Sequence, residues 1–81
     1  MKSLRNISAK ELINSLGKVG YSVSRQAGSH IRLTGTTNKG THHVTVPNHN
    51  PIKIGTLSSI LKDIAEQRGI SKDELFEILF G

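Results

Sequence analysis

The sequence predicts a small two-layer α+β domain, in which helices cover one face of a three-stranded antiparallel sheet. Three observations predict it: helix-capping signals near both ends of the chain, alternating apolar and polar residues in the middle, and a helical apolar period after residue 56. The 81 residues suffice for one domain with a thin core. We expect a single domain over residues 1–81, with its core at about 8–68 and a short C-terminal helix at about 71–80.

The first helix is predicted at about residues 9–19. Ser8 as N-cap and Glu11 three residues later form a capping-box sequence. Gly20 suits the left-handed residue that ends a helix. Apolar residues recur on one face between these signals, namely Leu12, Ile13, Leu16 and Val19.

A β-hairpin is predicted next, because alternation runs over residues 21–26 and resumes after Gly28. Tyr21 and Val23 would face inward from its first strand. A type I turn followed by Gly28 in the left-handed region is the turn that we expect, since Ala27 does not favour positive φ.

The second strand of the hairpin carries Ile31 and Leu33 on one face and His30, Arg32 and Thr34 on the other. We expect residues 35–41 to form a flexible polar loop. Residues 43–46 form the third strand, with His43 and Thr45 outward. The uncovered face of the sheet would then carry His30, Arg32, His43 and Thr45.

Two further helices complete the predicted order. The first follows Gly55, is capped by Thr56 and ends at Gly69, with its apolar residues at i, i+3, i+4 and i+7. The second opens with a capping box at Ser71 and Glu74 and runs to about Phe80. Its apolar residues cover more than one stripe, so it is either wrapped closely by the domain or makes an intermolecular contact.

Charge is unevenly distributed along the chain. Residues 1–62 carry nine Lys and Arg against one acidic residue, a net charge of +8, whereas residues 63–81 have a net charge of −3. A basic body favours polyanions such as nucleic acid. The alternative is a charge that serves solubility alone. With only three aromatic residues, the chain lacks rings for a base-stacking RNA platform.

His30 is the candidate for chemistry. An imidazole exchanges protons near neutral pH, and RNA supplies its own nucleophile in the 2′-hydroxyl. A ribonuclease without metal therefore needs one base or acid and cations for the developing phosphorane charge. His30 with Arg25, Arg32 and Lys53 meets that requirement, and the alternative is an ordinary surface histidine.

Other sites are less well supported by the sequence. The chain has no cysteine, and His42 and His43 are adjacent on a strand, so their side chains point to opposite faces. We expect no metal site and no cofactor. Gly55 and Thr56 at a helix start could hold a phosphate, although a plain N-cap explains them equally well.

Three motifs in this order resemble the HicA family of bacterial and archaeal toxins: Gly28-Ser29-His30, then residues 44–49 (Val-Thr-Val-Pro-Asn-His), then residues 53–57 (Lys-Ile-Gly-Thr-Leu). The similarity covers about residues 8–79, and residues 66–81 are longer than in compact members. The resemblance implies a fold like a double-stranded-RNA-binding domain, in the order α-β-β-β-α with a short extra C-terminal helix.

The resemblance also implies the toxin of a type II toxin–antitoxin system, an endoribonuclease that cleaves mRNA and is inhibited by a HicB-type antitoxin. Its single catalytic histidine matches His30. The RNA-binding residues that we expect beside it are Arg25, Ser29, Arg32, His43 and Lys53.

A non-catalytic RNA-binding module of the same fold is the alternative, although Lys53 is the one lysine at the start of the last main helix where such modules carry a cluster. The first residues carry charge without an apolar stretch behind them, and no apolar run approaches about 20 residues. We therefore expect a cytoplasmic protein with no membrane contact, and a monomer when free of antitoxin.

Overall fold

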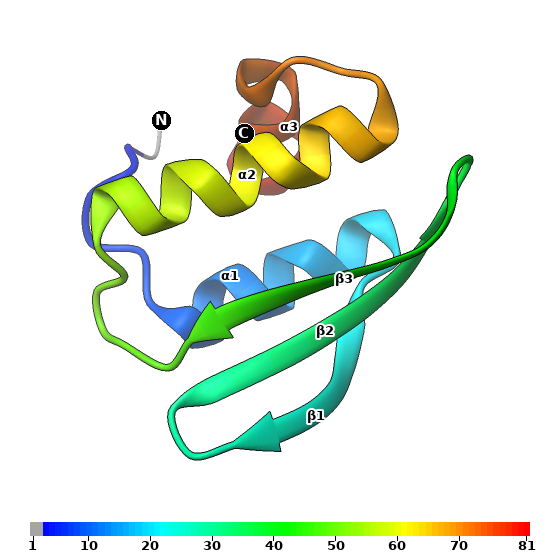
Figure 1. Ribbon diagram of the computed structural model, residues 1–81. Coiled ribbons are helices and arrows are strands. Elements are labelled where there is room, and N and C mark those ends of the chain that lie inside the picture. Colours follow the sequence, from blue (N-terminus) through cyan, green and yellow to red (C-terminus); the bar gives the residue numbers. More distant parts are fainter. Residues whose placement is uncertain (1–2) are drawn as a thin grey trace.

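The computed structural model describes residues 3–81. Its elements are α1 (Ala9–Leu16), the 3₁₀ turn η1 (Gly17–Val19), β1 (Ser22–Ala27), β2 (His30–Thr37), β3 (Gly40–Pro47), α2 (Ile54–Arg68) and α3 (Lys72–Phe80). The strands form one antiparallel sheet in the order β1-β2-β3, and the helices form a second layer (Figure 1). This arrangement confirms the predicted α+β class and is consistent with the α-β-β-β-α order of double-stranded-RNA-binding domains.

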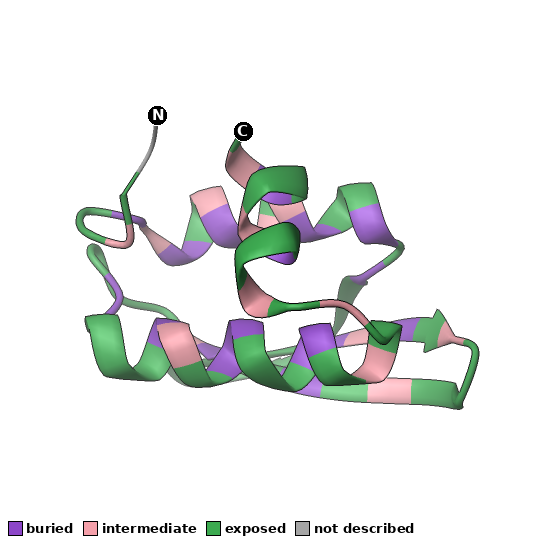
Figure 2. Cartoon of the chain, turned by 90° about the horizontal axis from the view of Figure 1, so that it is seen from above, coloured by how far each residue is buried: buried purple, intermediate pink, exposed green. Residues whose placement is uncertain are grey.

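The core lies between the sheet and the helices. Ile31, Leu33, Val44 and Val46 project from β2 and β3 into it and are buried. Buried positions recur along each helix on the side that faces the sheet or another helix (Figure 2). The helical residues at full burial include Leu12, Leu16, Leu57, Leu61, Ile64 and Leu75. No polar or charged side chain is buried within residues 3–81, so the core is wholly apolar.

The predicted helix ends are mostly confirmed. The Ser8 hydroxyl accepts a hydrogen bond from the Glu11 backbone N–H at 3.1 Å, and Gly20 ends the segment with φ 86°. The predicted helix over 9–19 is therefore correct in extent, although its last turn tightens into η1. Ser71 and Glu74 form the full reciprocal capping box of α3.

The start of α2 was predicted too late. Lys53, not Thr56, is the N-cap, and its side chain makes no capping hydrogen bond. The reason lies in the preceding loop, where Ile52 is buried and its N–H donates to the Ile7 carbonyl at 2.8 Å. This anchor fixes the chain next to the core, and the helix begins as soon as the anchored segment ends.

The prediction of a flexible loop over 35–41 is wrong. The strands β2 and β3 continue until Asn38 and Lys39, which alone connect them, so the third strand is longer than the predicted 43–46. Threonines flank the turn and favour strand geometry, and Gly40 supplies a φ of 105°.

Gly35 allows β2 to continue as a regular strand beside the Tyr21 ring. The Tyr21 ring, at 3% exposure, packs directly against the backbone of Gly35, where a Cβ atom would lie 2.7 Å from the ring carbon Cδ2. Only glycine leaves room for this ring. Tyr21 itself precedes β1 and contributes to the core from outside the sheet ladder.

The hairpin turn between β1 and β2 differs from the predicted type. Ala27 pairs with His30, so the loop contains only Gly28 and Ser29. Gly28 has φ 59° and Ser29 has no positive φ, which is the pattern of a type II′ turn, not of a type I turn followed by a bulge. A type II′ turn needs a positive φ at its first central position, which glycine adopts without strain.

A β-bulge in β1 is the second departure from the predicted hairpin. Val23 pairs with Leu33 and the next pair is Arg25 with Arg32, so Ser24 is an extra residue in the ladder. Val23 faces the helical side as predicted, yet it is 50% exposed because β1 is an edge strand beyond the helical cover.

The C-terminal helix packs one face against its own domain and is not wrapped on all sides. Leu75 and Leu79 are buried, and α3 contacts both α2 and α1. The Lys18 ammonium donates to the Leu79 carbonyl at 2.9 Å, which satisfies one of the carbonyls at the end of α3. Ile78 remains 47% exposed. None of the helices within residues 3–81 has the length and apolar character needed to span a membrane.

Replacing Gly35 with alanine tests the contact with Tyr21. We expect Gly35→Ala to lower the free energy of unfolding by about 1–3 kcal/mol, because the added methyl displaces a buried ring. Gly55→Ala is the matched control, since a Cβ at Gly55 meets nothing within 4 Å. Urea unfolding of the two variants checks the expectation, and equal stabilities would contradict it.

Candidate active site

One face of the sheet is not covered by helices, and we call it the open face. Its side chains point away from the buried residues of the same strands. The register places rows of side chains across it, one of them formed by Arg25, Arg32 and Thr45. The residues of the open face include Ser24, Arg25, His30, Arg32, Thr34, Thr36, Thr41, His43 and Thr45. The structure thus confirms the predicted outward position of His30, Arg32, His43 and Thr45.

His30 lies at the rim of the open face, as the first residue of β2 after the tight turn. It pairs with Ala27 on one side and Pro47 on the other, and its side chain is exposed. A backbone hydrogen bond of 2.6 Å from the Asn48 N–H to the Ser29 carbonyl holds the turn against the loop after β3. Within residues 3–81 the imidazole has no hydrogen-bond partner, so both ring nitrogens are open to a ligand.

Arg25 and Arg32 are directly opposite each other on neighbouring strands. Without the bulge at Ser24, strict alternation would have turned Arg25 toward the helical side together with Val23. Two like charges at facing positions destabilise a sheet. Neither guanidinium contacts a carboxylate in the part of the chain that the structure describes. An anion over this pair would relieve the repulsion.

His43 is held by a chain of hydroxyl groups on the open face. Its Nδ1 lies 2.8 Å from the Thr34 hydroxyl, which donates to the Ser24 hydroxyl, also at 2.8 Å. Ser24 in turn donates to the backbone carbonyl of Arg32 at 3.3 Å. Neither Ser24 nor Thr34 was predicted as part of a site, because the bulge in β1 has no signature in the residue pattern.

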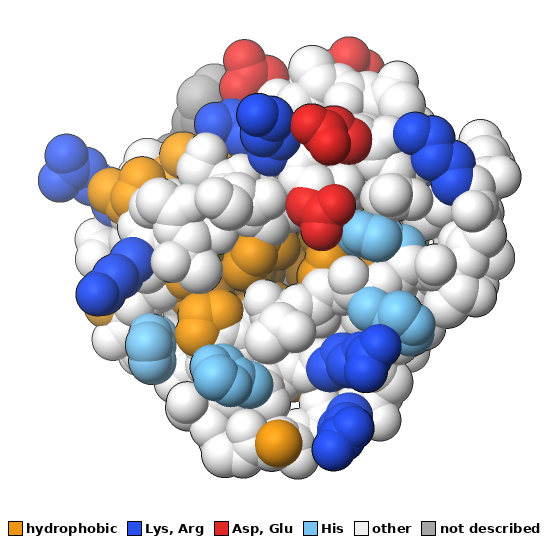
Figure 3. Space-filling model, viewed as in Figure 1, with side chains coloured by type: hydrophobic (Ala, Val, Ile, Leu, Met, Phe, Trp, Pro, Cys, Tyr) orange, Lys and Arg blue, Asp and Glu red, His pale blue; other side chains and the backbone are white. Residues whose placement is uncertain are grey.

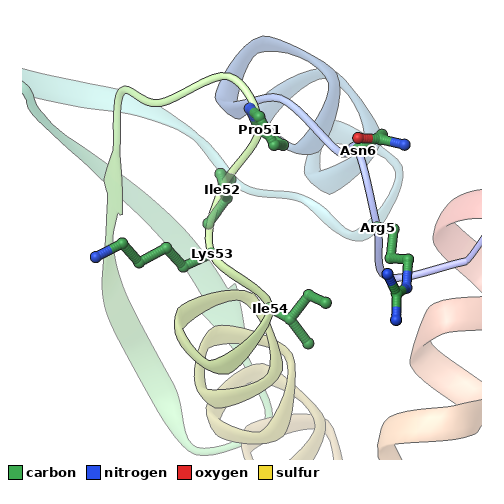
Figure 4. Close-up of a pocket in the computed structure, with 6 residues that line it drawn as sticks. All are labelled: Arg5, Asn6, Pro51, Ile52, Lys53 and Ile54. Carbon is green, nitrogen blue, oxygen red and sulfur yellow. The ribbon is translucent and has the colours of Figure 1, made fainter.

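Lys53 is the N-cap of α2 and belongs to no strand of the open face. It lines a shallow pocket with Arg5, Asn6 and Pro51, as well as with two isoleucines of the same segment. Figure 4 shows the Lys53 side chain extended on the β3 side of the helix start, away from Arg5. The two cations therefore do not converge on one point. Lys53 has no hydrogen-bond or ion-pair partner within residues 3–81.

His42 has a structural role on the opposite face of β3. Its Nδ1 lies 2.7 Å from the Tyr21 hydroxyl and its Nε2 lies 3.2 Å from a carboxylate oxygen of Asp63 on α2. Burial raises the pKa of Tyr21, and Asp63 adds to this effect while Arg68 opposes it, so the phenol stays protonated and donates to the imidazole. This chain joins β3 to α2, and it confirms that His42 and His43 point to opposite faces.

The acidic side chains and the histidines lie over different parts of the molecule in the view of Figure 3. Acidic side chains lie over the helical half, together with several lysine and arginine side chains, whereas histidines lie over the sheet with further lysine and arginine side chains near them. The residues that the structure brings together on one face are His30, Arg25, Arg32 and His43. Ser29 lies in the turn beside His30, and Lys53 belongs to the helical layer.

A protein-family model described as the HicA toxin of bacterial toxin–antitoxin systems matches residues 9–65. This span covers most of the chain, including the whole sheet. The chain belongs to the HicA toxin family. Searches of the curated proteins and of the solved structures give no significant match. The part of the chain outside the HicA match includes α3, which the domain nevertheless buries against α2.

Proposed function

We propose that this HicA-family toxin is an endoribonuclease that cleaves mRNA in the cytoplasm without a metal ion, with His30 as its catalytic residue. The observation that supports this most directly is the exposed, unpartnered His30 imidazole at the rim of a face that also carries the Arg25–Arg32 pair. Membership of the HicA family supports the toxin role.

The chemistry needs one proton acceptor at neutral pH. His30 takes the proton of a ribose 2′-hydroxyl, whose oxygen attacks the adjacent phosphorus and forms a 2′,3′-cyclic phosphate. The bond from phosphorus to the 5′-oxygen breaks, and water supplies the proton to the leaving oxygen. His30 then returns its proton to solvent. DNA lacks the 2′-hydroxyl and is not a substrate in this scheme.

The cations of the open face stabilise the negative charge that grows on the phosphoryl oxygens. Arg25 and Arg32 are placed for this role because their guanidinium groups lie in the row next to His30. Ser29, in the turn, contacts the RNA beside the cut, and His43 contacts it farther along the sheet. Lys53 binds a phosphate outside the open face, where the chain of the RNA passes the start of α2.

Replacing His30 with alanine tests the central step. We expect His30→Ala to lower the rate of RNA cleavage in EDTA by about 10²–10⁴-fold, which is the usual contribution of a general base. Growth arrest on expression should disappear with it. The matched control is Asn14→Ala, at an exposed position of α1 in the helical layer that the mechanism does not use.

Circular dichroism must show that both variants are folded. Cleavage by folded His30→Ala at the wild-type rate would refute the role of His30. If the wild type binds RNA and never cuts it, the protein is a non-catalytic RNA-binding module. If cleavage requires a divalent ion, the metal-free scheme is wrong.

A HicB-type antitoxin is the partner that we propose, and it would cover the open face. The net charge of +8 over residues 1–62 favours an acidic contact surface on that partner. We expect the purified complex to cleave no RNA. The double variant Arg25→Glu with Arg32→Glu, which reverses both charges, should bind the antitoxin much more weakly. The control Lys10→Glu on α1 should bind it as the wild type does. Binding by calorimetry measures this, and full ribonuclease activity in the complex would contradict it.

A further inference from the structure

The hydroxyl chain beside His43 determines which of its ring nitrogens carries the proton. The backbone carbonyl of Arg32 can only accept, so Ser24 must donate its single proton to it. Ser24 then accepts from Thr34, whose single proton is used in turn. The Thr34 hydroxyl is left as an acceptor toward His43, and Nδ1 of His43 must therefore be the N–H that donates to it.

This assignment leaves Nε2 of the neutral imidazole as a hydrogen-bond acceptor. His43 is exposed on the open face, so the acceptor is accessible to a ligand on the sheet. The cations of this face, Arg25 and Arg32, can only donate. His43 thus adds a hydrogen-bond acceptor to a surface whose arginines donate to phosphate.

His43 is too far from His30 to act on the same bond. It pairs with Thr34, four residues along β2 from His30, which corresponds to about 14 Å at about 3.4 Å per residue. An acid and a base that share one phosphodiester must both lie within hydrogen-bond reach of it. His43 therefore contacts a different nucleotide from the one that is cut.

We propose that His43 is a specificity-determining residue that accepts a hydrogen bond from a ribonucleotide displaced by two or more positions from the cleaved bond. The donor is either a 2′-hydroxyl or an exocyclic amino group of a base, which an unpaired RNA strand presents beside the ring N–H groups of guanine and uracil. Thr34 and Ser24 are positioning residues that hold the imidazole in this tautomer. The inference rests on the proposed ribonuclease function and adds a second contact to it.

The substrate side of the proposal is tested with a short RNA that has one cleavage site. The first series of substrates carries a single 2′-deoxy substitution at each position in turn. The second series replaces a single guanosine by inosine or a single adenosine by purine riboside, which removes an amino group. In the wild type we expect one position away from the cut at which the substitution lowers kcat/KM on the order of 3- to 10-fold, the value of one hydrogen bond. In His43→Ala that position-specific penalty should vanish.

The two series distinguish the sources of the donor, since a 2′-hydroxyl responds only to the first and a base amino group only to the second. A penalty that persists unchanged in His43→Ala, or no sensitive position at all, would overturn the proposal while leaving cleavage by His30 intact. Loss of all cleavage in the wild type would instead reject the ribonuclease function.

The protein side of the proposal is tested without RNA. Nitrogen-15 NMR of the histidine rings in the free protein should show His43 in the Nδ1–H form near pH 8. Thr34→Val, which removes the hydroxyl and keeps the branched shape, should shift His43 toward the Nε2–H form. Thr45→Val on the same face, with no side-chain hydrogen bond in the described structure, is the control and should change nothing. An Nε2–H form in the wild type would overturn the assignment.

Discussion

One extra residue in an edge strand, Ser24, determines the composition of the open face. Because Ser24 and Arg25 together oppose Arg32, the side chains beyond the bulge exchange faces. Arg25 then lies beside Arg32 and not on the helical side with Val23. The Ser24 hydroxyl also completes the chain to Thr34 and His43. Without the bulge, Ser24 would oppose Arg32 and Arg25 would turn to the helical side, so the face would lose one of its two arginines.

The remainder of the fold keeps this face uncovered and ties both ends of the sheet to neighbouring segments. All three helices pack on the opposite side, where the core is wholly apolar within residues 3–81. The Tyr21 ring over Gly35 and the link from His42 to Asp63 hold the far end of the sheet against α2. The loop after β3 holds the near end, through the bond from Asn48 to Ser29. A small domain thus presents an uncovered sheet face that carries two arginines and two histidines.

Local signals predicted much of this structure because they act over a few residues. The capping residues Ser8 and Ser71, the left-handed Gly20 and the alternation around Ile31 each specify their own segment. Features that depend on distant residues were not predictable in the same way. The continuation of β2 through Gly35 depends on where the Tyr21 ring packs, and the early start of α2 depends on the anchor between Ile52 and Ile7.

The candidate site shows the same division. Alternation alone placed His30 and Arg32 on one face, and the motif around Gly28-Ser29-His30 indicated the family. The position of Arg25 beside Arg32 depends on the bulge. The prediction assumed unbroken alternation and therefore contained no bulge. Thr34 and Ser24 looked like ordinary strand residues, since a hydroxyl becomes informative only when its partners are known. Lys53 was grouped with the site from sequence, whereas the structure places it in the helical layer.

RNA binding on the open face through the paired arginines is the central proposal. The salt dependence of binding to a 2′-O-methyl RNA, which cannot be cleaved, tests this most directly. Replacing Arg25 and Arg32 together by alanine should reduce the slope of log K against log salt by about 1.4, since each phosphate contact on a single strand contributes about 0.7. Replacing Lys10 and Lys62 of the helical layer should leave the slope nearly unchanged. An unchanged slope in the arginine variant, or a larger loss in the lysine variant, would contradict the account.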